Sequence, residues 1–477
     1  MQIRRWAASA AAATAAAVMM AAQAVPSAQR VRGGQWVGTW ATAVVARPQG
    51  PAAAPQPFGA GFPAPQCFGE PPKEPAVGAA PTAPVPAAPA QAAAAARNGG
   101  PGPGAVGRGQ GGGGRGPAGP PINFSNQTLR QIVHTSIGGD RVRVVLSNVF
   151  GTAPLAIGAA HVALRDKGAA IVPRTGRVLT FGGSPIVNIP PGASVVSDAA
   201  NLAVPPLSDL AIDVYLPGDT SSSPLTMHTG ALQTNYVSEA GNHTGAPDLP
   251  GASTTTSWFF LARVEVSAPE GAGAIVAFGD SITDGTRSTP DANARWPDAL
   301  ARRLLAQKIN LGVLNEGIAG NRVLADGAGV SALARFDRDA IAQAGASYVI
   351  VLESINDIGL GREGPCPSAG DLIAAHQQLI ERAHARGMRI YGATLTPFEG
   401  AAYWTREGEA KRRAVNDWIR SAKAYDGVID FDAAVRDPNA PTRIRPQYNP
   451  GDNLHMNDAG YQAMADAIDL ALFRQKK

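Results

Sequence analysis

The sequence Ala-Ile-Val-Ala-Phe-Gly-Asp-Ser at residues 274–281 is the strongest indication of the fold in this chain of 477 residues. A short apolar run followed directly by glycine and polar residues is typical of a strand buried on both faces of a parallel sheet. Ser281 would then stand just beyond the carboxyl end of that strand. Because ligands of open α/β sheets bind beyond the carboxyl ends of the strands, this serine is expected to face a site.

The same pattern repeats along the rest of the C-terminal half, where apolar strand-like runs alternate with amphipathic stretches that predict helices. Strands are expected at 274–278, 311–315, 348–352, 389–394 and 427–431, and helices at 296–307, 331–343, 368–385, 408–423 and 458–473. Strands that alternate with helices in this way predict an α/β domain over residues 272–477, with a parallel sheet covered on both faces.

Upstream of residue 272 the sequence is rich in short β-branched runs separated by Gly, Pro and Asp. Strands are predicted at 35–43, 128–134, 141–147, 177–181, 210–216 and 235–240. Repeated short strands with such turns are typical of a β-sandwich or jelly roll. This domain is predicted to consist of residues 33–47 and 122–268, so that the chain leaves it after the first strand and returns later.

Two segments are expected to lie outside both domains. Residues 48–121 consist largely of Gly, Pro and Ala and cannot bury enough apolar surface to offset chain entropy, which predicts a disordered insertion. Residues 1–24 combine Arg4 and Arg5 with an apolar run and a small-x-small ending, which predicts a signal peptide and a secreted or periplasmic protein. An N-terminal membrane anchor is the alternative, although the run is short and mostly Ala.

The charges and the cysteines limit the classes of partner and cofactor. The formal net charge is +4, and no stripe of Lys and Arg with interleaved aromatic residues occurs, so a nucleic-acid partner is not expected. No later apolar stretch is long enough for a stable membrane span. Cys67 and Cys366 could form one disulfide or remain two free thiols. Neither belongs to a Cys/His cluster with metal-ligand spacing, so no metal site is predicted.

Polar residues stand at the carboxyl ends of three predicted strands. Ser281, in Gly-Asp-Ser-Ile-Thr-Asp-Gly, could act as a nucleophile or cap a helix. Residues 315–322, Asn-Glu-Gly-Ile-Ala-Gly-Asn-Arg, contain Gly317 and Gly320, whose N–H groups could approach an oxyanion or belong to an ordinary turn. Asn356, in Glu-Ser-Ile-Asn-Asp, could donate its amide to the same oxyanion or cap a helix.

A fourth segment, Asp-Asn-Leu-His at 452–455, directly precedes the last predicted helix. An Asp and a His three residues apart in a turn allow the carboxylate to bind imidazole Nδ1, which fixes the tautomer and turns Nε2 toward a serine. Taken singly, a capping aspartate and a surface histidine would explain this segment equally well. The four segments together favour catalysis.

In order and in position, these four segments resemble the sequence blocks of the SGNH or GDSL-type hydrolases, and the resemblance covers residues 272–473. Arg-Trp-Pro at 295–297 is similar to the secreted bacterial members that carry an N-terminal β-sandwich, as are the segments 127–131 and 146–151. The resemblance implies a flavodoxin-like three-layer α/β/α hydrolase domain at 272–477, preceded by a β-sandwich domain.

The resemblance also implies roles for single residues. Ser281 matches the nucleophile, His455 the base and Asp452 its orienting partner. The oxyanion donors would be Ser281, Gly320 and Asn356, with Gly320 preferred to Gly317 because it directly precedes the polar Asn321. No metal or organic cofactor is implied. Ser354 departs from the family, which usually has Gly there, and its side chain is expected to narrow the acyl pocket.

The implied activity is that of a secreted serine esterase acting on acetyl or short-chain esters, either small molecules or polysaccharides. Phe398, Tyr403 and Trp404 would either wall the acyl site or pack in the core. A non-catalytic carbohydrate-binding protein that retains the fold is the main alternative, although it would be expected to have lost part of the four segments. A nucleotide-binding domain would need a phosphate loop where Asp280 and Asp284 stand. The sequence gives no indication of the oligomeric state.

Overall fold

The computed structural model of the chain describes residues 34–49, 122–360 and 366–474. The predicted signal peptide, nearly all of the predicted insertion and Cys67 lie outside these residues. The predictions made for them, including the alternatives of one disulfide or two free thiols for Cys67 and Cys366, therefore stay predictions. In the described ranges, the helices are all too short or too polar to cross a membrane.

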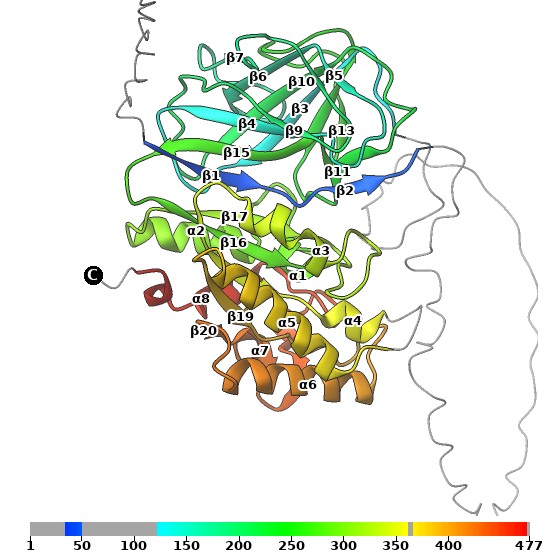
Figure 1. Cartoon of the computed structure of the whole chain (residues 1–477), viewed down its shortest axis with the longest axis vertical. Helices are drawn as coiled ribbons and strands as arrows, with labels where there is room; N and C mark the ends of the chain where they lie inside the picture. Colours follow the sequence, from blue (N-terminus) through cyan, green and yellow to red (C-terminus); the bar gives the residue numbers. More distant parts are fainter. Residues whose placement is uncertain (1–33, 50–121, 361–365, 475–477) are drawn as a thin grey trace, which may run out of the picture. The chain divides into compact units, whose positions relative to one another are not determined.

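The N-terminal half is built of antiparallel sheets (Figure 1). One sheet has the strand order β1-β15-β4-β9 and another has the order β13-β12-β3-β10-β6-β7, while β14-β11-β2 and β5-β8 form smaller sheets. Val264 of the first sheet and Val214 of the second belong to one buried core, as in a β-sandwich. The strands are β1 (Gln35–Ala41), β2 (Val45–Arg47), β3 (Gln127–His134), β4 (Val142–Ser147), β5 (Leu155–Ile157), β6 (Ala159–Leu164), β7 (Arg177–Leu179), β8 (Val187–Ile189), β9 (Ser194–Val196), β10 (Asp209–Leu216), β11 (Leu225–Thr229), β12 (Asn235–Ala240), β13 (Ser253–Thr255), β14 (Ser257–Phe259) and β15 (Leu261–Ala268).

One long central strand, β15, was not predicted from the sequence. Its residues include Glu265, which is almost fully buried, and such a residue interrupts the apolar pattern by which strands are recognised. The structure compensates the buried carboxylate with two guanidinium groups, because Arg143 Nε lies 2.5 Å and Arg263 Nε 2.7 Å from its oxygens. The strand could therefore be recognised only from the folded chain, where Arg143 and Arg263 pair with Glu265.

The C-terminal half contains a five-stranded parallel sheet with the order β17-β16-β18-β19-β20, which is the flavodoxin-like order expected for this half. The strands are β16 (Gly273–Gly279), β17 (Leu311–Gly317), β18 (Ala346–Leu352), β19 (Arg389–Ala393) and β20 (Gly427–Ile429). The order reverses between β16 and β18, and the carboxyl ends of strands at such a point form the usual ligand site of the fold.

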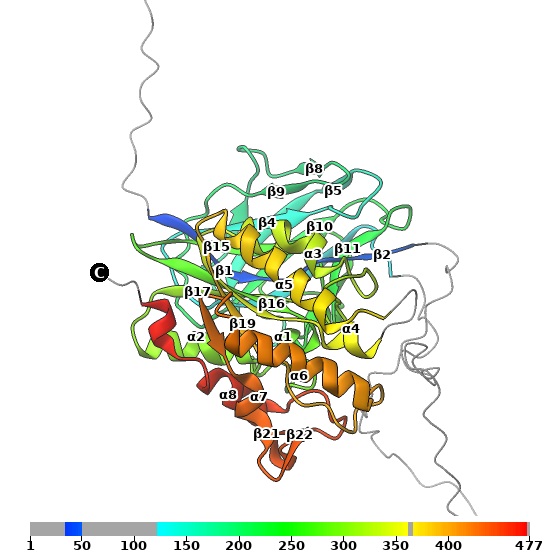
Figure 2. The same cartoon turned by 60° about the horizontal axis from the view of Figure 1, so that its bottom comes forward.

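Helices cover both faces of the parallel sheet (Figures 1 and 2). On one face Phe278 of β16 packs against Phe336 of α3, with 5.2 Å between ring centroids. On the other face Tyr348 of β18 packs against Phe473 near the end of the described chain. The helices are α1 (Ser281–Asp284), α2 (Trp296–Ala306), α3 (Ala332–Phe336), α4 (Ile355–Gly359), α5 (Ala369–His384), α6 (Arg406–Ser421), α7 (Phe431–Val435) and α8 (Asp458–Asp466), and a short hairpin joins β21 (Arg436–Asp437) to β22 (Ala440–Ile444).

Two of the predicted helices are wrong in extent. The helix predicted at 331–343 is α3 followed by a π-helical turn, η1 (Asp337–Ile341), which contains the buried Asp339. The helix predicted at 458–473 ends at Asp466. The Asp469 side chain then accepts a hydrogen bond from the Ala471 N–H and starts a separate 3₁₀ turn, η3 (Leu470–Phe473), because a short polar side chain competes for backbone donors.

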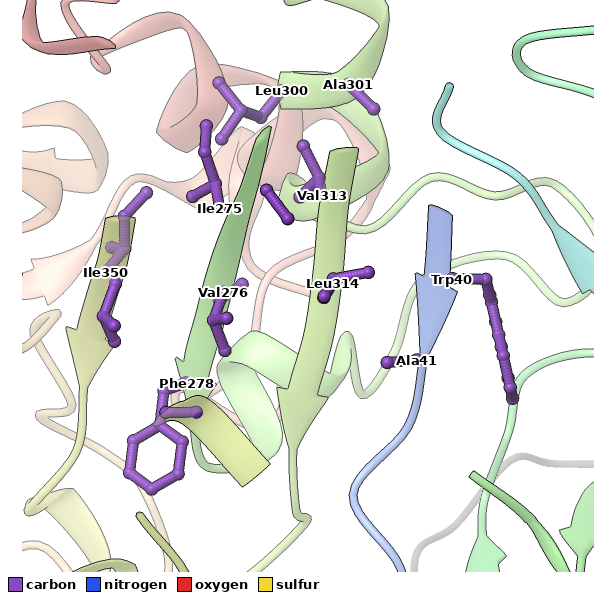
Figure 3. Packing of buried hydrophobic residues seen from close by; sticks show 14 of the residues in the cluster. Trp40, Ala41, Ile275, Val276, Phe278, Leu300, Ala301, Val313, Leu314 and Ile350 are labelled. Atoms are coloured by element: carbon purple, nitrogen blue, oxygen red, sulfur yellow. The ribbon is translucent and has the colours of Figure 1, made fainter. Parts of the chain in front are cut away.

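Strand β1 joins the two halves of the molecule. It pairs antiparallel with β15 on one side and runs beside β17 on the other, with a parallel bridge between Thr42 and Asn315 (Figure 3). Glycine permits this close approach, since a Cβ on Gly312 would lie 2.1 Å from the Gly38 carbonyl oxygen. The sandwich therefore covers the β17 edge of the parallel sheet.

Candidate active site

Ser281 stands at the carboxyl end of β16, at the first position of α1. The Asp280 side chain caps this short helix by accepting a hydrogen bond of 2.9 Å from the Ile282 N–H. Gly279 allows the tight turn, because a Cβ there would lie 2.2 Å from Thr283 Oγ1 and 2.6 Å from the Leu352 carbonyl oxygen. The nucleophile candidate is thus held on rigid elements and is only 5% exposed.

The structure brings His455 and Asp452 to Ser281. His455 Nε2 lies 2.8 Å from Ser281 Oγ, and His455 Nδ1 lies 2.9 Å from Asp452 Oδ2. Asp452 Oδ1 also accepts hydrogen bonds from the Leu454 and His455 N–H groups, at 3.1 and 3.0 Å. A carboxylate on Nδ1 leaves Nε2 free to take the serine proton, which is the geometry of a catalytic triad.

The Asp452 carboxyl group is held in its ionised form. Burial alone would raise the pKa of Asp452, but hydrogen bonds and charge from His455 hold that pKa well below its usual range. A cation also contacts this group, since Arg287 Nε lies 2.9 Å from Asp452 Oδ2. Arg287 was not identified from the sequence, because nothing local links it to a residue 165 positions away.

The three predicted oxyanion donors lie at the ends of β16, β17 and β18. Within the described ranges, no acceptor is bonded to the backbone N–H of Ser281 or of Gly320, whose φ of +81° favours glycine. Asn356 Nδ2 donates to the Asn321 carbonyl oxygen at 2.9 Å, and Asn356 Oδ1 accepts from the Tyr403 hydroxyl at 3.3 Å. An amide nitrogen carries two hydrogens, so the Asn356 amide can still donate one to a ligand.

Asp357, in the segment after β18, forms hydrogen bonds to the loop after β17 that carries Gly320. Its two carboxylate oxygens accept from the Val323 and Leu324 N–H groups at 2.8 and 3.0 Å. Burial raises the pKa of Asp357 to about 6, although these hydrogen bonds oppose the rise. Asp357 adjoins the predicted Asn356 and positions the loop that carries Gly320, but it was not itself identified from the sequence.

A second residue missed in the sequence, Arg335 of α3, lies fully buried beneath the site. Its guanidinium nitrogens donate to the Gly279 carbonyl oxygen at 2.9 Å, the Glu316 carbonyl oxygen at 2.8 Å and Asn321 Oδ1 at 2.9 Å. Gly279 is the last residue of β16, Glu316 is the next to last residue of β17, and Asn321 adjoins Gly320. One side chain therefore fixes the relative positions of the segments that carry the nucleophile and the oxyanion donors.

Buried carboxyl groups surround this arginine. Burial raises the pKa of Asp280 to about 7, and the Asp280 Oδ2 atom has no hydrogen-bond partner in the described ranges. Burial and the nearby Asp280 also raise the pKa of Glu353, whose Oε1 lies 3.3 Å from Arg335 Nη2. Carboxyl groups in this state carry a proton at neutral pH more often than exposed ones do, which limits the negative charge behind Ser281.

Ser354 adopts a backbone conformation that favours glycine, the residue that the resembling hydrolases usually have at this position. Its φ is +104°, in the region that side chains with a Cβ rarely occupy. Its hydroxyl lies 3.0 Å from Nε2 of His376, a fully buried residue of α5 whose pKa is lowered to about 4 by burial. The side chain is thus engaged with α5, and this contact lends no support to the expected narrowing of the acyl pocket.

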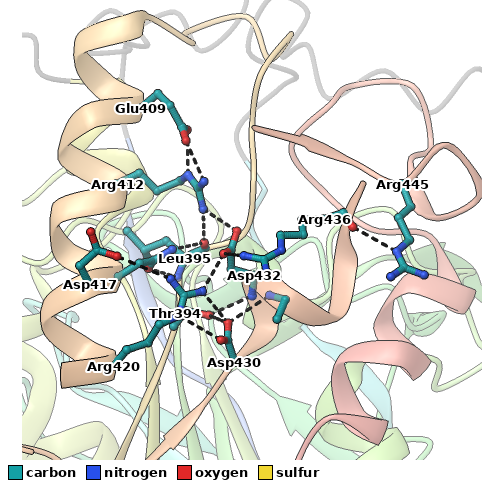
Figure 4. A network of polar contacts seen from close by, with 12 residues as sticks. Thr394, Leu395, Glu409, Arg412, Asp417, Arg420, Asp430, Asp432, Arg436 and Arg445 are labelled. Atoms are coloured by element: carbon teal, nitrogen blue, oxygen red, sulfur yellow. Dashed lines mark hydrogen bonds and ion pairs between the residues drawn. The ribbon is translucent and has the colours of Figure 1, made fainter. Parts of the chain in front are cut away.

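The aromatic residues after β19 divide between the core and the site. Phe398 is fully buried in the core, and Trp404 packs against it. Tyr403 is buried as well, but its hydroxyl reaches Asn356. A charged network holds the start of this loop, because Arg412 of α6 donates to the Leu395 carbonyl oxygen at 2.7 Å while it pairs with Glu409 and Asp432 (Figure 4).

Among the described residues, no group of three or more His, Cys, Asp or Glu side chains is arranged to hold a metal ion. Residues 277–463 match the model of the GDSL-like lipase/acylhydrolase family. This part of the chain belongs to that family. The protein is accordingly a carboxylic ester hydrolase, and its α/β half is called the esterase domain below.

Several solved structures are similar to the esterase domain. A GDSL-like lipase from Bacteroides thetaiotaomicron is 19% identical, with 42% of this chain and 87% of that chain covered and a TM-score of 0.32. A carbohydrate acetylesterase family member from Sinorhizobium meliloti is 17% identical, with 41% and 94% covered and a TM-score of 0.33. An alpha/beta hydrolase from the metagenome of Lake Arreo, Spain, is 22% identical, with 42% and 94% covered and a TM-score of 0.34. No curated protein sequence matches the chain.

Proposed function

We propose that the protein is a secreted or periplasmic serine esterase that hydrolyses acetyl or short-chain carboxylic esters, including esters on carbohydrates. The observation that carries the proposal is the continuous hydrogen-bonded series from Asp452 through His455 to Ser281 Oγ, with distances of 2.9 and 2.8 Å. Two segments far apart in the sequence, the end of β16 and the turn at 452–455, meet with the order and spacing that activate a serine.

In the proposed reaction His455 Nε2 takes the Ser281 proton as Oγ forms a bond to the ester carbonyl carbon. The Ser281 and Gly320 N–H groups and the Asn356 amide donate to the oxyanion. The intermediate collapses, the ester C–O bond breaks, and the alcohol leaves with the proton held by His455. Water then attacks the acyl-enzyme by the same route, releasing the acid and restoring Ser281. No step requires a metal or an organic cofactor.

The described surface supports a short acyl group. Long-chain lipid substrates need a broad exposed apolar surface at the site. Of the exposed large apolar residues among the described ones, Leu324, 38% exposed, belongs to the loops around Ser281, and others such as Val178 and Ile186 lie on the sandwich. The carbohydrate part of the proposal rests on the sequence resemblance.

The test is hydrolysis of p-nitrophenyl acetate, butyrate and octanoate by the purified protein, beside Ser281→Ala and the matched control Ser347→Ala. Ser347 is an exposed serine at the opposite end of the sheet, in β18. We expect rates that fall with chain length, vanish in Ser281→Ala and persist in the control. Activity that is unaffected by Ser281→Ala, or no activity on any ester, would favour the carbohydrate-binding alternative.

Export is tested separately, because residues 1–24 lie outside the described part of the chain. Expression with and without these residues in a bacterial host should give activity in the periplasm or medium only when they are present. Equal activity in the cytoplasmic fraction of both strains would contradict the proposed location.

A further inference from the structure

The loop between α1 and α2, residues 285–295, connects the proposed triad to the sandwich. Near its start, Arg287 Nε lies 2.9 Å from Asp452 Oδ2. His455 Nδ1 lies 2.9 Å from the same oxygen atom. Arg287 therefore shares with His455 the carboxylate oxygen that would orient the imidazole. The Arg287 backbone has a φ of +77°, an unfavourable conformation for arginine that surrounding contacts must hold in place.

The sandwich supplies such contacts further along the same loop. The Asp291 N–H donates to the Leu232 carbonyl oxygen at 2.9 Å. Asp291 Oδ1 accepts from Gln233 Nε2 and from the Thr234 N–H, both at 2.6 Å, and Asp291 Oδ2 accepts from Thr234 Oγ1 at 2.6 Å. Residues 232–234 join β11 to β12 of the sandwich. Asp291 also has a positive φ, of +61°.

The esterase domain holds the rest of this loop. The Tyr461 hydroxyl of α8 donates to the Thr286 carbonyl oxygen at 2.7 Å, and the Thr289 N–H donates to Asp458 Oδ1 at 2.8 Å. Arg287 lies between these two points of attachment. The backbone around it is therefore fixed by α8 on both sides, and the sandwich holds the loop further along, at Asp291.

We propose that Arg287 is a positioning residue for ester hydrolysis, which holds Asp452 in line with His455, and that the sandwich takes part in the active site by holding the Arg287 loop through Asp291. This proposal rests on the proposed function of Ser281, Asp452 and His455. It gives the N-terminal domain a catalytic task in addition to covering the edge of the sheet.

The positive charge of Arg287 should affect the pH dependence of the reaction. A positive charge at Asp452 disfavours further positive charge that develops beside it during the reaction. The other ionisable groups near Asp452 and His455 are the carboxyl groups of Asp280 and Asp284, on the α1 side, and the hydroxyls of Tyr403 and Tyr461. Arg335 acts on Asp280 and His228 pairs with Asp284, whereas Arg287 is the cation in direct contact with Asp452, so its removal should shift the pH profile in one direction.

The first test compares wild type, Arg287→Gln and Arg287→Lys on p-nitrophenyl acetate, with Arg382→Gln as the matched control. Arg382 is a similarly exposed ion-paired arginine on α5, 30% exposed against 32% for Arg287. We expect Arg287→Gln to lower kcat about tenfold with little change in KM. The acidic limb of kcat/KM should move to higher pH by about half a unit. Arg287→Lys should restore part of both effects, and Arg382→Gln should match wild type.

The second test asks whether the sandwich acts through Arg287. Asp291→Ala removes the three hydrogen bonds to Gln233 and Thr234 and should lower kcat about threefold. In the Arg287→Gln background the same change should have no further effect, because the residue that it positions is already gone. If the decreases in kcat caused by Arg287→Gln and by Asp291→Ala multiply in the double variant, the link between the sandwich and Arg287 is overturned.

The outcomes separate this proposal from the proposed function. If Ser281→Ala retains full activity, the proposed function fails, and the positioning role of Arg287 that rests on it is overturned as well. If Ser281→Ala is inactive but Arg287→Gln keeps the wild-type kcat and pH profile, the proposed function stands and the positioning role of Arg287 is overturned.

Discussion

Asn356 gives the most direct residue-scale test of the oxyanion donors. Replacing Asn356 with Ala removes one amide donor from the site while the backbone of α4 can remain. We expect kcat on p-nitrophenyl acetate to fall about a hundredfold or more. Circular dichroism and the unfolding midpoint should stay close to wild type. A variant within about threefold of the wild-type kcat would contradict the assigned role.

Ser354 allows the strain of a positive φ to be separated from a buried hydrogen bond. Ser354→Ala and Ser354→Gly both remove the hydroxyl that contacts His376. Only Gly relieves the backbone at φ +104°, so Ser354→Gly should be more stable than Ser354→Ala by about 1 kcal/mol. Urea unfolding measures both variants. Equal free energies of unfolding for the two variants would contradict a cost of the positive φ at residue 354.

At this scale, the sequence indicates candidate residues where they belong to a sequence block, but not where they act across the fold. Ser281, Gly320, Asn356, Asp452 and His455 each follow a predicted strand or precede a predicted helix, so local sequence indicated them. Arg335 and Arg287 are single arginines without a motif. Their partners lie on elements whose contacts only the folded chain establishes.

At the scale of the elements, the close approach of β1 to β17 can be tested, because Gly38 and Gly312 face each other there. A Cβ on Gly312 would meet the Gly38 carbonyl oxygen at 2.1 Å, a backbone atom that cannot turn away. Gly312→Ala should therefore lower the free energy of unfolding by about 3 kcal/mol. Gly370→Ala in α5 is the control, since its Cβ would meet nothing closer than 3.5 Å, and it should change stability by less than about 1 kcal/mol.

The extent of the elements was predictable where one periodicity continued without a polar competitor. The helix predicted at 368–385 is α5 at 369–384, and the Ser368 side chain caps it by accepting a hydrogen bond from the Asp371 N–H. The helix predicted at 458–473 failed because Asp469 caps a new turn. Strand β15 was missed because Glu265 is buried by long-range ion pairs. In both failures a side-chain interaction overrode the local pattern.

At the scale of the whole molecule, His228 of β11 links the sandwich to the helix that begins with Ser281. His228 Nε2 lies 3.1 Å from Asp284 Oδ1, and Nδ1 lies 2.7 Å from the Ala43 carbonyl oxygen. Burial alone would lower the pKa of His228, but Asp284 and this carbonyl outweigh burial and raise it. Both ring nitrogens can then donate, which describes a charged imidazolium in a buried ion pair.

The raised pKa of His228 predicts a pH-dependent stability. The stabilisation should be complete below about pH 6.5, where the unfolded histidine is charged too, and lost as pH rises through the higher folded value. The difference in unfolding free energy between wild type and His228→Gln should therefore be largest near pH 5.5 and shrink toward pH 8.5. Urea unfolding at both pH values measures it. A difference independent of pH would contradict a charged His228.

The two-part architecture was predictable from the sequence, but the junction was not. The change from short β-branched runs to alternating strands and helices near residue 272 indicated where the fold class changes. That β1 lies beside β17, and that residues 228–234 of the sandwich contact the loop after Ser281, depend on pairings between distant segments. Local composition carries no information about such pairings.

The double pairing of β1 also fixes an order of events during synthesis. About 220 residues separate β1 from β15, and β17 is made later still. At ordinary rates of translation this interval lasts on the order of tens of seconds. During that time residues 35–41, an apolar segment with two tryptophans, have neither of their final neighbours. The nascent chain must therefore keep this segment from aggregating until most of the protein has been made.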